Sequence, residues 1–253
     1  MRITTNLSHA VFAASLIALG ILGLITADFA SVWQAVPKSV PAREALAYLC
    51  AGVSVAAGLG LLWRRTSLVA ARVVLVYCLL WLLLLKVPDV IRAPMVEVSW
   101  LGCGEIAVLV AGAWVLYAAF ARGGFAGGDG GRRGARLLFG LALIPLGLAH
   151  LIYAEQTSAM VPAWLPFSHL FWAYLTGATY LAASAAVLLG RYARLAAALT
   201  AVQMGGFALL VWVPMVAAAA GKDASFQWAG LLISMFLAAG AWVVADSCAG
   251  MKR

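Results

Sequence analysis

Apolar residues run along this chain in eight long blocks, and polar residues gather in the short segments between them. Each block approaches the roughly 20 residues that an α-helix needs to cross about 30 Å of hydrocarbon. None alternates apolar and polar residues with period two, as the strands of a membrane β-barrel do. The pattern predicts eight membrane-spanning helices, approximately His9–Ala30, Ala45–Trp63, Leu68–Pro88, Ser99–Ala121, Leu137–Ala154, His169–Leu189, Leu195–Val216 and Trp228–Asp246.

The composition agrees with this pattern. Of 253 residues, 65% are hydrophobic and only 10% are charged, whereas soluble domains carry about 25% charged residues. The net charge of +8 comes from Lys and Arg in the short segments, so it indicates membrane topology and contact with anionic lipid. We therefore expect an all-α integral membrane protein whose partner is the lipid bilayer and not a nucleic acid.

Basic residues divide unevenly between the two sides of the predicted membrane. One side collects eleven: Arg2, Arg64, Arg65, Arg122, Arg132, Arg133, Arg136, Arg191, Arg194, Lys252 and Arg253. The other collects five: Lys38, Arg43, Lys86, Arg92 and Lys222. The positive-inside rule then predicts a multi-pass protein of the inner (plasma) membrane with both termini in the cytoplasm.

The chain divides into two similar halves. Residues 122–136 (RGGFAGGDGGRRGAR) are rich in Gly and Arg and are predicted to form a flexible cytoplasmic linker between residues 1–121 and 137–253. Matched positions recur at a spacing that drifts only from 124 to 128 residues: Gly23 with Gly147, Pro37 and Pro41 with Pro162 and Pro166, Gly52 with Gly177, Trp100 and Gly102 with Trp228 and Gly230. Val87-Pro88 is predicted to close the third span as Val213-Pro214 closes the seventh. We interpret this as a tandem duplication that gives two four-helix bundles as a parallel repeat.

The best-defined motif lies in the segment Gly147–Gly177. It combines Gly147-x-x-His150, the run Met160–Pro166 and the run Tyr174–Gly177. This pattern resembles the signature of DoxX-like membrane proteins, which implies a small four-helix inner-membrane fold and, for some members, a link to thiosulfate and quinone oxidation. In the first half, Thr26 aligns with His150 and Ser39-Val40-Pro41 replaces Trp164-Leu165-Pro166. The resemblance implies that the first half serves as scaffold.

Ionisable residues in or beside spans are functional candidates. His150 lies near the outer end of the fifth predicted span and Glu155 follows it, so the two could relay protons or hold a quinone head group. An interfacial histidine with a hydrogen bond to a neighbouring loop explains the same residues. Glu105 lies about two turns inside the fourth predicted span, with Lys86 and Arg92 as its natural partners. A proton carrier and an interhelical hydrogen bond both stay open for it.

The segment Met160–Pro166 is predicted to form a stiff turn, because its prolines fix φ and exclude helix. The aromatic residues around it would line a pocket or form an interfacial belt. Cys50 and Cys103 could pair if the second and fourth spans touch, and burial as small hydrophobes is the alternative. The candidate site, with no metal and no assigned catalytic group, comprises His150, Glu155, His169, Glu105, Trp164, Trp172 and Tyr174.

Three functions fit these features. The first is a non-enzymatic accessory or scaffold subunit for a membrane or periplasmic redox or export partner. The second is a quinone-linked oxidoreductase subunit, with quinone as the candidate cofactor. The third is a small-solute or proton-coupled carrier. An accessory role predicts an exposed apolar or aromatic surface, a redox role predicts a bound quinone, and a carrier predicts a polar cavity that reaches the middle of the membrane.

Overall fold

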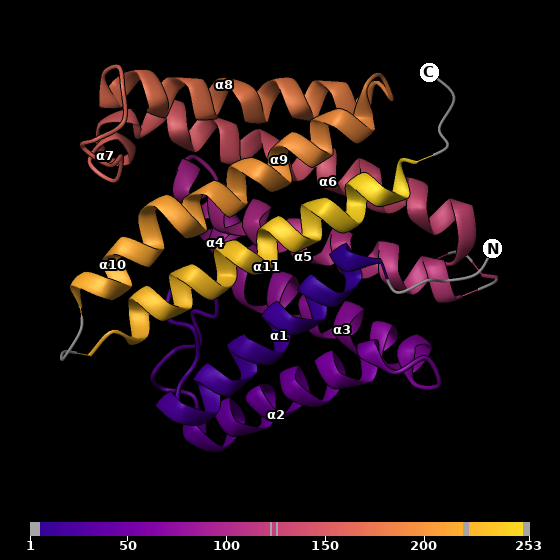
Figure 1. The fold of residues 1–253 in the computed structure, drawn as a ribbon. Helices are drawn as coiled ribbons and strands as arrows, with labels where there is room; N and C mark the ends of the chain where they lie inside the picture. Colours follow the sequence, from indigo (N-terminus) through magenta and orange to yellow (C-terminus); the bar gives the residue numbers. More distant parts are fainter. Residues whose placement is uncertain (1–5, 122, 125, 220–222, 250–253) are drawn as a thin grey trace.

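Long helices make up almost the whole fold in the computed structural model, which describes residues 6–121, 123–124, 126–219 and 223–249 (Figure 1). Within these ranges there is no strand, and eight helices are long and apolar enough to cross a membrane. They are α1 (Leu7–Thr26), α2 (Arg43–Leu62), α3–η1–α4 (Ser67–Arg92), α5 (Glu97–Phe120), α6 (Gly128–Ile152), α8 (His169–Leu188), α9–η2–α10 (Ala193–Ala218) and α11 (Ser225–Ser247). A short helix, α7 (Ala154–Ser158), lies between α6 and α8. The predicted all-α architecture with eight candidate spans is confirmed.

Helices α5 and α11 form the centre of the bundle. In each of them 67% of the most apolar window is buried, against 33–44% in the other six. They cross where Gly112 meets Gly240: a Cβ atom on Gly112 would lie 2.8 Å from the Cα atom of Gly240. Small residues at a crossing let two helix backbones approach closely. The rings of Phe12 and Phe236 pack beside this crossing, 4.6 Å apart.

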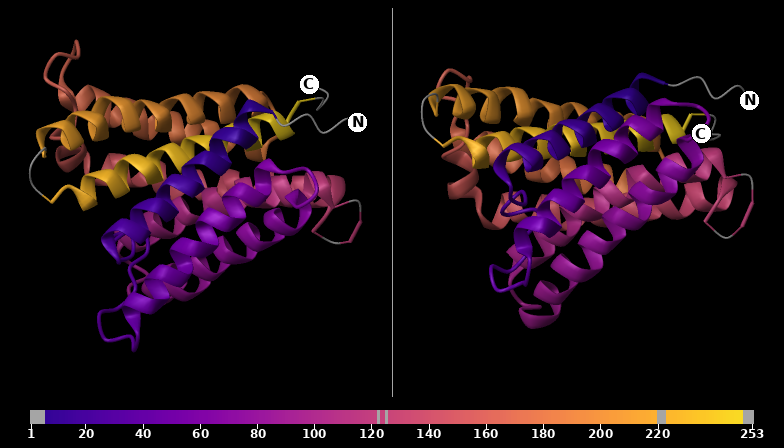
Figure 2. Two further views of the ribbon diagram at one scale, coloured as in Figure 1. Left: turned by 60° about the horizontal axis from the view of Figure 1, so that its bottom comes forward. Right: turned by 90° about the horizontal axis from the view of Figure 1, so that it is seen from below.

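The outer helices pack in two similar sets around this centre (Figure 2). Helix α1 packs on α2 and on α11, while α6 packs on α8 and on α5. Helix α3 packs on α5, and α9 packs on α11. Helix α1 therefore contacts the last helix of the chain, and each outer set leans on both central helices. Helix α1 begins and α11 ends at one end of the bundle, and α7 lies at the other, which we call the corner end (Figure 1).

Two π-helical segments change the paths of the third and seventh spans. They are η1 (Leu82–Lys86), between α3 (Ser67–Trp81) and α4 (Val87–Arg92), and η2 (Ala208–Trp212), between α9 (Ala193–Phe207) and α10 (Val213–Ala218). The prediction that Val87-Pro88 and Val213-Pro214 close these spans is wrong, because the chain stays helical for one more turn after each proline. In each widened turn the N–H group before the proline bonds five residues back, from Val87 to Leu82 and from Val213 to Ala208.

The predicted linker 122–136 is wrong in its second part, because α6 begins at Gly128. The glycines that suggested flexibility instead provide space for packing. The Trp114 ring lies against Gly134, within 2.6 Å of where a Cβ atom would be, and the Trp114 indole donates a hydrogen bond to the Ala126 carbonyl (2.9 Å). Further along α6, the Arg136 Nε atom donates to the Ser247 hydroxyl of α11 (3.1 Å).

Some sequence predictions concern residues beyond those that the structure describes. Of the residues used to predict orientation, Arg2, Arg122, Lys222, Lys252 and Arg253 lie outside the described ranges. Cys50, Cys78, Cys103 and Cys248 are all free thiols, so Cys50 and Cys103 do not pair in this structure.

Candidate functional site

A cavity of about 470 Å³ lies among α5, α6, α8, α9, η2 and α11. The segment that joins α7 to α8 forms part of its wall. Its wall is mostly apolar and aromatic. The side chains that could bind a ligand through polar atoms include His150, Glu105, Tyr180 and Gln203. A volume of this size, with an apolar wall and a few polar groups, is typical of small-molecule sites in proteins. Leu210, Val211 and Trp212 of η2 line the cavity too, and π-helical turns often occur at functional sites.

His150 is positioned by a close contact between two helices. Gly147 and Gly177 face each other where α6 meets α8, and a Cβ atom on either would lie 3.0 Å from the other's carbonyl oxygen. One turn beyond Gly147, the His150 ring contacts the rings of Tyr180 (5.4 Å between centroids) and Phe207 (5.6 Å). Its Nδ1 atom is 2.8 Å from the Leu146 carbonyl oxygen. A carbonyl only accepts hydrogen bonds, so Nδ1 is the nitrogen that carries hydrogen.

Glu105 reaches the same cavity from α5. Trp33, in the segment between α1 and α2, lies in the same cavity wall, and its side chain interacts with the Glu105 carboxyl group. Trp33 is almost fully buried (6% exposed) and packs edge-on against Trp212, with 5.9 Å between ring centroids. The first half of the chain thus supplies part of the wall of a cavity built mainly by the second half.

Lys86 is the cation that acts on Glu105. It ends η1 and is only 6% exposed, and its Nζ atom donates a hydrogen bond to the Val32 carbonyl (2.7 Å). The Lys86 side chain lies over Gly102, with Nζ 3.2 Å from where a Cβ atom would be. A lysine buried at this depth in a candidate span is unfavourable unless its charge is compensated. The sequence correctly indicated Lys86 as a partner for Glu105, while Arg92 forms an exposed ion pair with Asp89 (3.5 Å).

A second polar group lies where α8 meets α9. The Gln203 Nε2 atom donates to the Thr176 carbonyl (3.2 Å), and its Oε1 atom accepts from the Thr179 hydroxyl (2.6 Å). The Tyr180 side chain also interacts with Gln203. The sequence analysis missed Tyr180 and Gln203. Gln203 could have been found because it places an amide side chain within a predicted span, whereas no such signal marks Tyr180.

The structure brings together only some of the predicted site residues. His150, Glu105 and Trp172 line the cavity, and the Trp172 indole donates to the Pro166 carbonyl (2.6 Å). The corner run contributes Met160, Val161, Pro162 and Leu165 to the wall. Four predicted residues do not line it: Glu155 in α7, His169 at the start of α8, and the exposed Trp164 (69%) and Tyr174 (51%).

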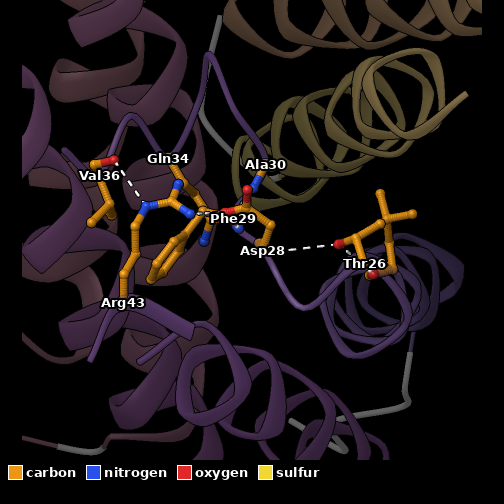
Figure 3. A network of polar contacts seen from close by, with 8 residues as sticks. Thr26, Asp28, Phe29, Ala30, Gln34, Val36 and Arg43 are labelled. Atoms are coloured by element: carbon orange, nitrogen blue, oxygen red, sulfur yellow. Dashed lines mark hydrogen bonds and ion pairs between the residues drawn. The ribbon is translucent and has the colours of Figure 1, made fainter. Parts of the chain in front are cut away.

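The first half has a much smaller cavity, of about 90 Å³, near the end of α1. Thr26, Asp28, Phe29 and Gln34 are among the residues that line it. Polar contacts join the residues of this region to one another (Figure 3). Asp28 forms an ion pair with Arg43, the Arg43 guanidinium lies 5.3 Å from the centre of the Phe29 ring, and the Gln34 side chain accepts from the Ala30 amide (2.9 Å).

Comparison with known proteins adds one match. Residues 139–245 match the family model of a domain of unknown function, DUF8561. No curated protein and no solved structure matches the chain. The matched segment contains His150, Tyr180 and Gln203, so it covers most of the cavity wall but not Glu105 or Trp33.

Proposed function

We propose that this chain is an inner-membrane protein that binds the head group of a quinone-class molecule in the cavity of its second half. The observation that carries the proposal is the combination of about 470 Å³ of largely apolar space with His150 and Glu105 in its wall. A quinone ring needs apolar and aromatic surroundings together with a small number of polar contacts. Both are present, and the long helices α5, α6, α8 and α9 hold the polar groups.

The proposed tandem repeat gives the cavity its context. In support of the repeat, both central helices contain the sequence Ala-Gly-Ala-Trp, at 111–114 and 239–242, and the two middle glycines meet where the helices cross. The two π-helical segments also lie 126 residues apart. Together with the motif around His150, this supports the proposal of two fused DoxX-like units with both termini in the cytoplasm. The corner end would then face the outer side of the membrane.

That the chain is an accessory subunit for a redox or export partner stays a prediction, and binding of a quinone is compatible with it.

Transport of a small solute is a second candidate function, and one observation favours it. The cavity wall extends from Pro162, in the segment at the corner end, to Gln203. Gln203 lies about ten residues after the start of α9, and α9 starts at the end of the bundle opposite the corner end. A carrier needs such a path toward the middle of the membrane.

Mass spectrometry of lipids extracted from the purified protein tests the proposal. We expect quinone at about one molecule per chain in the wild type, and its loss in Gly206→Phe. Gly206 lines the cavity, and a Cβ atom there would meet no other atom within 4 Å, so a benzyl group would fill the space.

Gly52→Phe is the matched control, since a Cβ atom on Gly52 also meets nothing within 4 Å and Gly52 is remote from the cavity. This variant should retain quinone, while His150→Ala should bind less. Phospholipid alone in every sample, or equal quinone in wild type and Gly206→Phe, contradicts the proposal.

A further inference from the structure

His150 presents a hydrogen-bond acceptor to the cavity. Because Nδ1 carries the hydrogen that is donated to the Leu146 carbonyl (2.8 Å), Nε2 of the neutral ring has a free lone pair. The neutral ring is the main form of histidine near pH 7 even without any perturbation. Among the described residues, no hydrogen bond to His150 Nε2 occurs, although the side chain lines the cavity.

Several donors around the cavity are already used inside the protein. The Trp172 indole donates to the Pro166 carbonyl (2.6 Å), the Thr176 hydroxyl donates to the Trp172 carbonyl (2.9 Å), and the Gln203 amide donates to the Thr176 carbonyl (3.2 Å). The Trp212 indole and the Ser234 hydroxyl also lie in the wall. A ligand group that donates to His150 and also accepts would therefore suit this wall better than one that only accepts.

A carbonyl group cannot donate to Nε2, but a hydroxyl group can. A bound quinone would leave the acceptor unpaired in a largely apolar cavity, and an unpaired buried polar group weakens binding. A phenolic hydroxyl pairs with Nε2 and keeps its own lone pairs for donors such as Ser234. The rings of Tyr180 and Phe207, 5.4 and 5.6 Å from the His150 ring, provide apolar surfaces next to this contact.

We propose that the cavity is selective for aromatic molecules that bear a hydroxyl group, of the phenol or quinol class, with His150 Nε2 accepting the hydroxyl hydrogen. This inference rests on the proposed function and specifies which form of the ligand is bound. Glu105 supplies a second acceptor in the wall, for a second hydroxyl group on the same ring.

The test compares a 4-alkylphenol with its methyl ether, which has nearly the same shape but no hydroxyl hydrogen. Binding to the full-length protein in lipid nanodiscs is followed by quenching of tryptophan fluorescence, with empty nanodiscs as the baseline for partitioning. We expect the wild type to bind the phenol about tenfold more tightly than the ether, which corresponds to about 1.4 kcal/mol.

Variants at His150 locate the preference. His150→Phe keeps an aromatic ring next to Tyr180 and Phe207 but removes the acceptor, so it should bind both probes equally. His169→Phe, outside the cavity wall, should keep the full preference. His150→Gln supplies a carbonyl oxygen as an acceptor and should keep part of it, which provides a folded variant if His150→Phe does not fold.

The possible results separate the two proposals. Equal binding of both probes by the wild type, or a preference that persists in His150→Phe, overturns the selectivity and leaves a ligand-binding cavity. Absence of binding by the phenol, the ether and a short-chain quinone overturns the proposed function itself.

Discussion

The two halves of the chain place similar helices around similar positions, but only the second half encloses a large cavity. Its cavity is about 470 Å³, and the one near the end of α1 is about 90 Å³. Residues aligned at the sequence spacing of 124 residues line both: Leu146 with Leu22, His150 with Thr26, and Tyr153 with Phe29. The difference teaches that the site depends on which side chains fill the space between the helices, more than on the path of the backbone.

The first half of the chain also contributes residues to the cavity of the second half. Lys86 and Trp212 are aligned at the ends of η1 and η2, and each packs over an aligned glycine, Gly102 or Gly230. The first half therefore places a charge where the second places an aromatic ring. Glu105 and Trp33 of the first half line the cavity, which lies mainly in the second half, and Lys86 acts on Glu105 without lining the cavity itself. The expectation that the first half is only scaffold needs this refinement.

The largest effect is expected for Lys86→Met. The change removes the cation that acts on Glu105 and the bond to the Val32 carbonyl (2.7 Å), so the free energy of unfolding should fall by about 3–5 kcal/mol. Unfolding by denaturing detergent in mixed micelles measures it. The double variant Lys86→Met/Glu105→Gln should recover much of the loss. Arg92→Met, at an exposed ion pair, should change stability by less than about 0.5 kcal/mol; a similar loss there would contradict this account.

Aligned glycines should respond in opposite directions. In Gly177→Ala the new methyl group meets the end of the Leu151 side chain at 2.8 Å and the Gly147 carbonyl oxygen at 3.0 Å, so Leu151 must shift and the α6–α8 contact must widen slightly. We expect a loss of about 1–3 kcal/mol in the free energy of unfolding. In Gly52→Ala the methyl group meets nothing within 4 Å, and helix propensity should stabilise the protein by up to about 1 kcal/mol. Thermal unfolding of both variants in one detergent tests this, and equal shifts would contradict it.

Trp33→Ala tests whether the first half takes part in the site. The variant loses the aromatic contact with Trp212 (5.9 Å between ring centroids) and the interaction with Glu105, so the affinity for a short-chain quinol should fall about tenfold, or about 1.4 kcal/mol. Fluorescence titration in nanodiscs measures the affinity. Trp100→Ala is the control, because Trp100 is half exposed (46%) and outside the cavity. Unchanged affinity in Trp33→Ala would limit the site to the second half.

The smallest effect is expected for Thr26→His, which places a histidine at the position aligned with His150. A cavity of about 90 Å³ is smaller than the roughly 150 Å³ that holds a single benzene ring. No second binding site should appear in titrations of this variant. A stoichiometry of two ligands per chain would show that the identity of this residue, rather than the volume of the cavity, distinguishes the halves.

The sequence predicted well those features that depend on local composition. Hydrophobic block length located all eight helices, and rare polar residues in apolar surroundings identified His150, Glu105 and Lys86. It did not predict the π-helical turns, because Leu82–Lys86 and Ala208–Trp212 carry no local pattern that differs from an α-helix. For that reason the helical turns after Pro88 and Pro214 were missed.

Features that depend on contacts between distant segments could not be read from the sequence. Trp33 lies far along the chain from Trp212, and only the packing of the bundle brings them together. The role of residues 128–136 was misjudged for the same reason, because the Trp114 ring that packs on Gly134 belongs to another helix. Glu155 and His169 are close to His150 in sequence, but neither lines the cavity.

Photolabelling with an azido-quinone, followed by peptide mapping, tests the central claim most directly. If the second-half cavity binds the ligand, the label should be found on its lining residues, such as Met204 and Phe207, and excess unlabelled quinol should prevent the reaction. Labelling in the first half, or labelling spread over lipid-facing residues and insensitive to competition, would contradict the account.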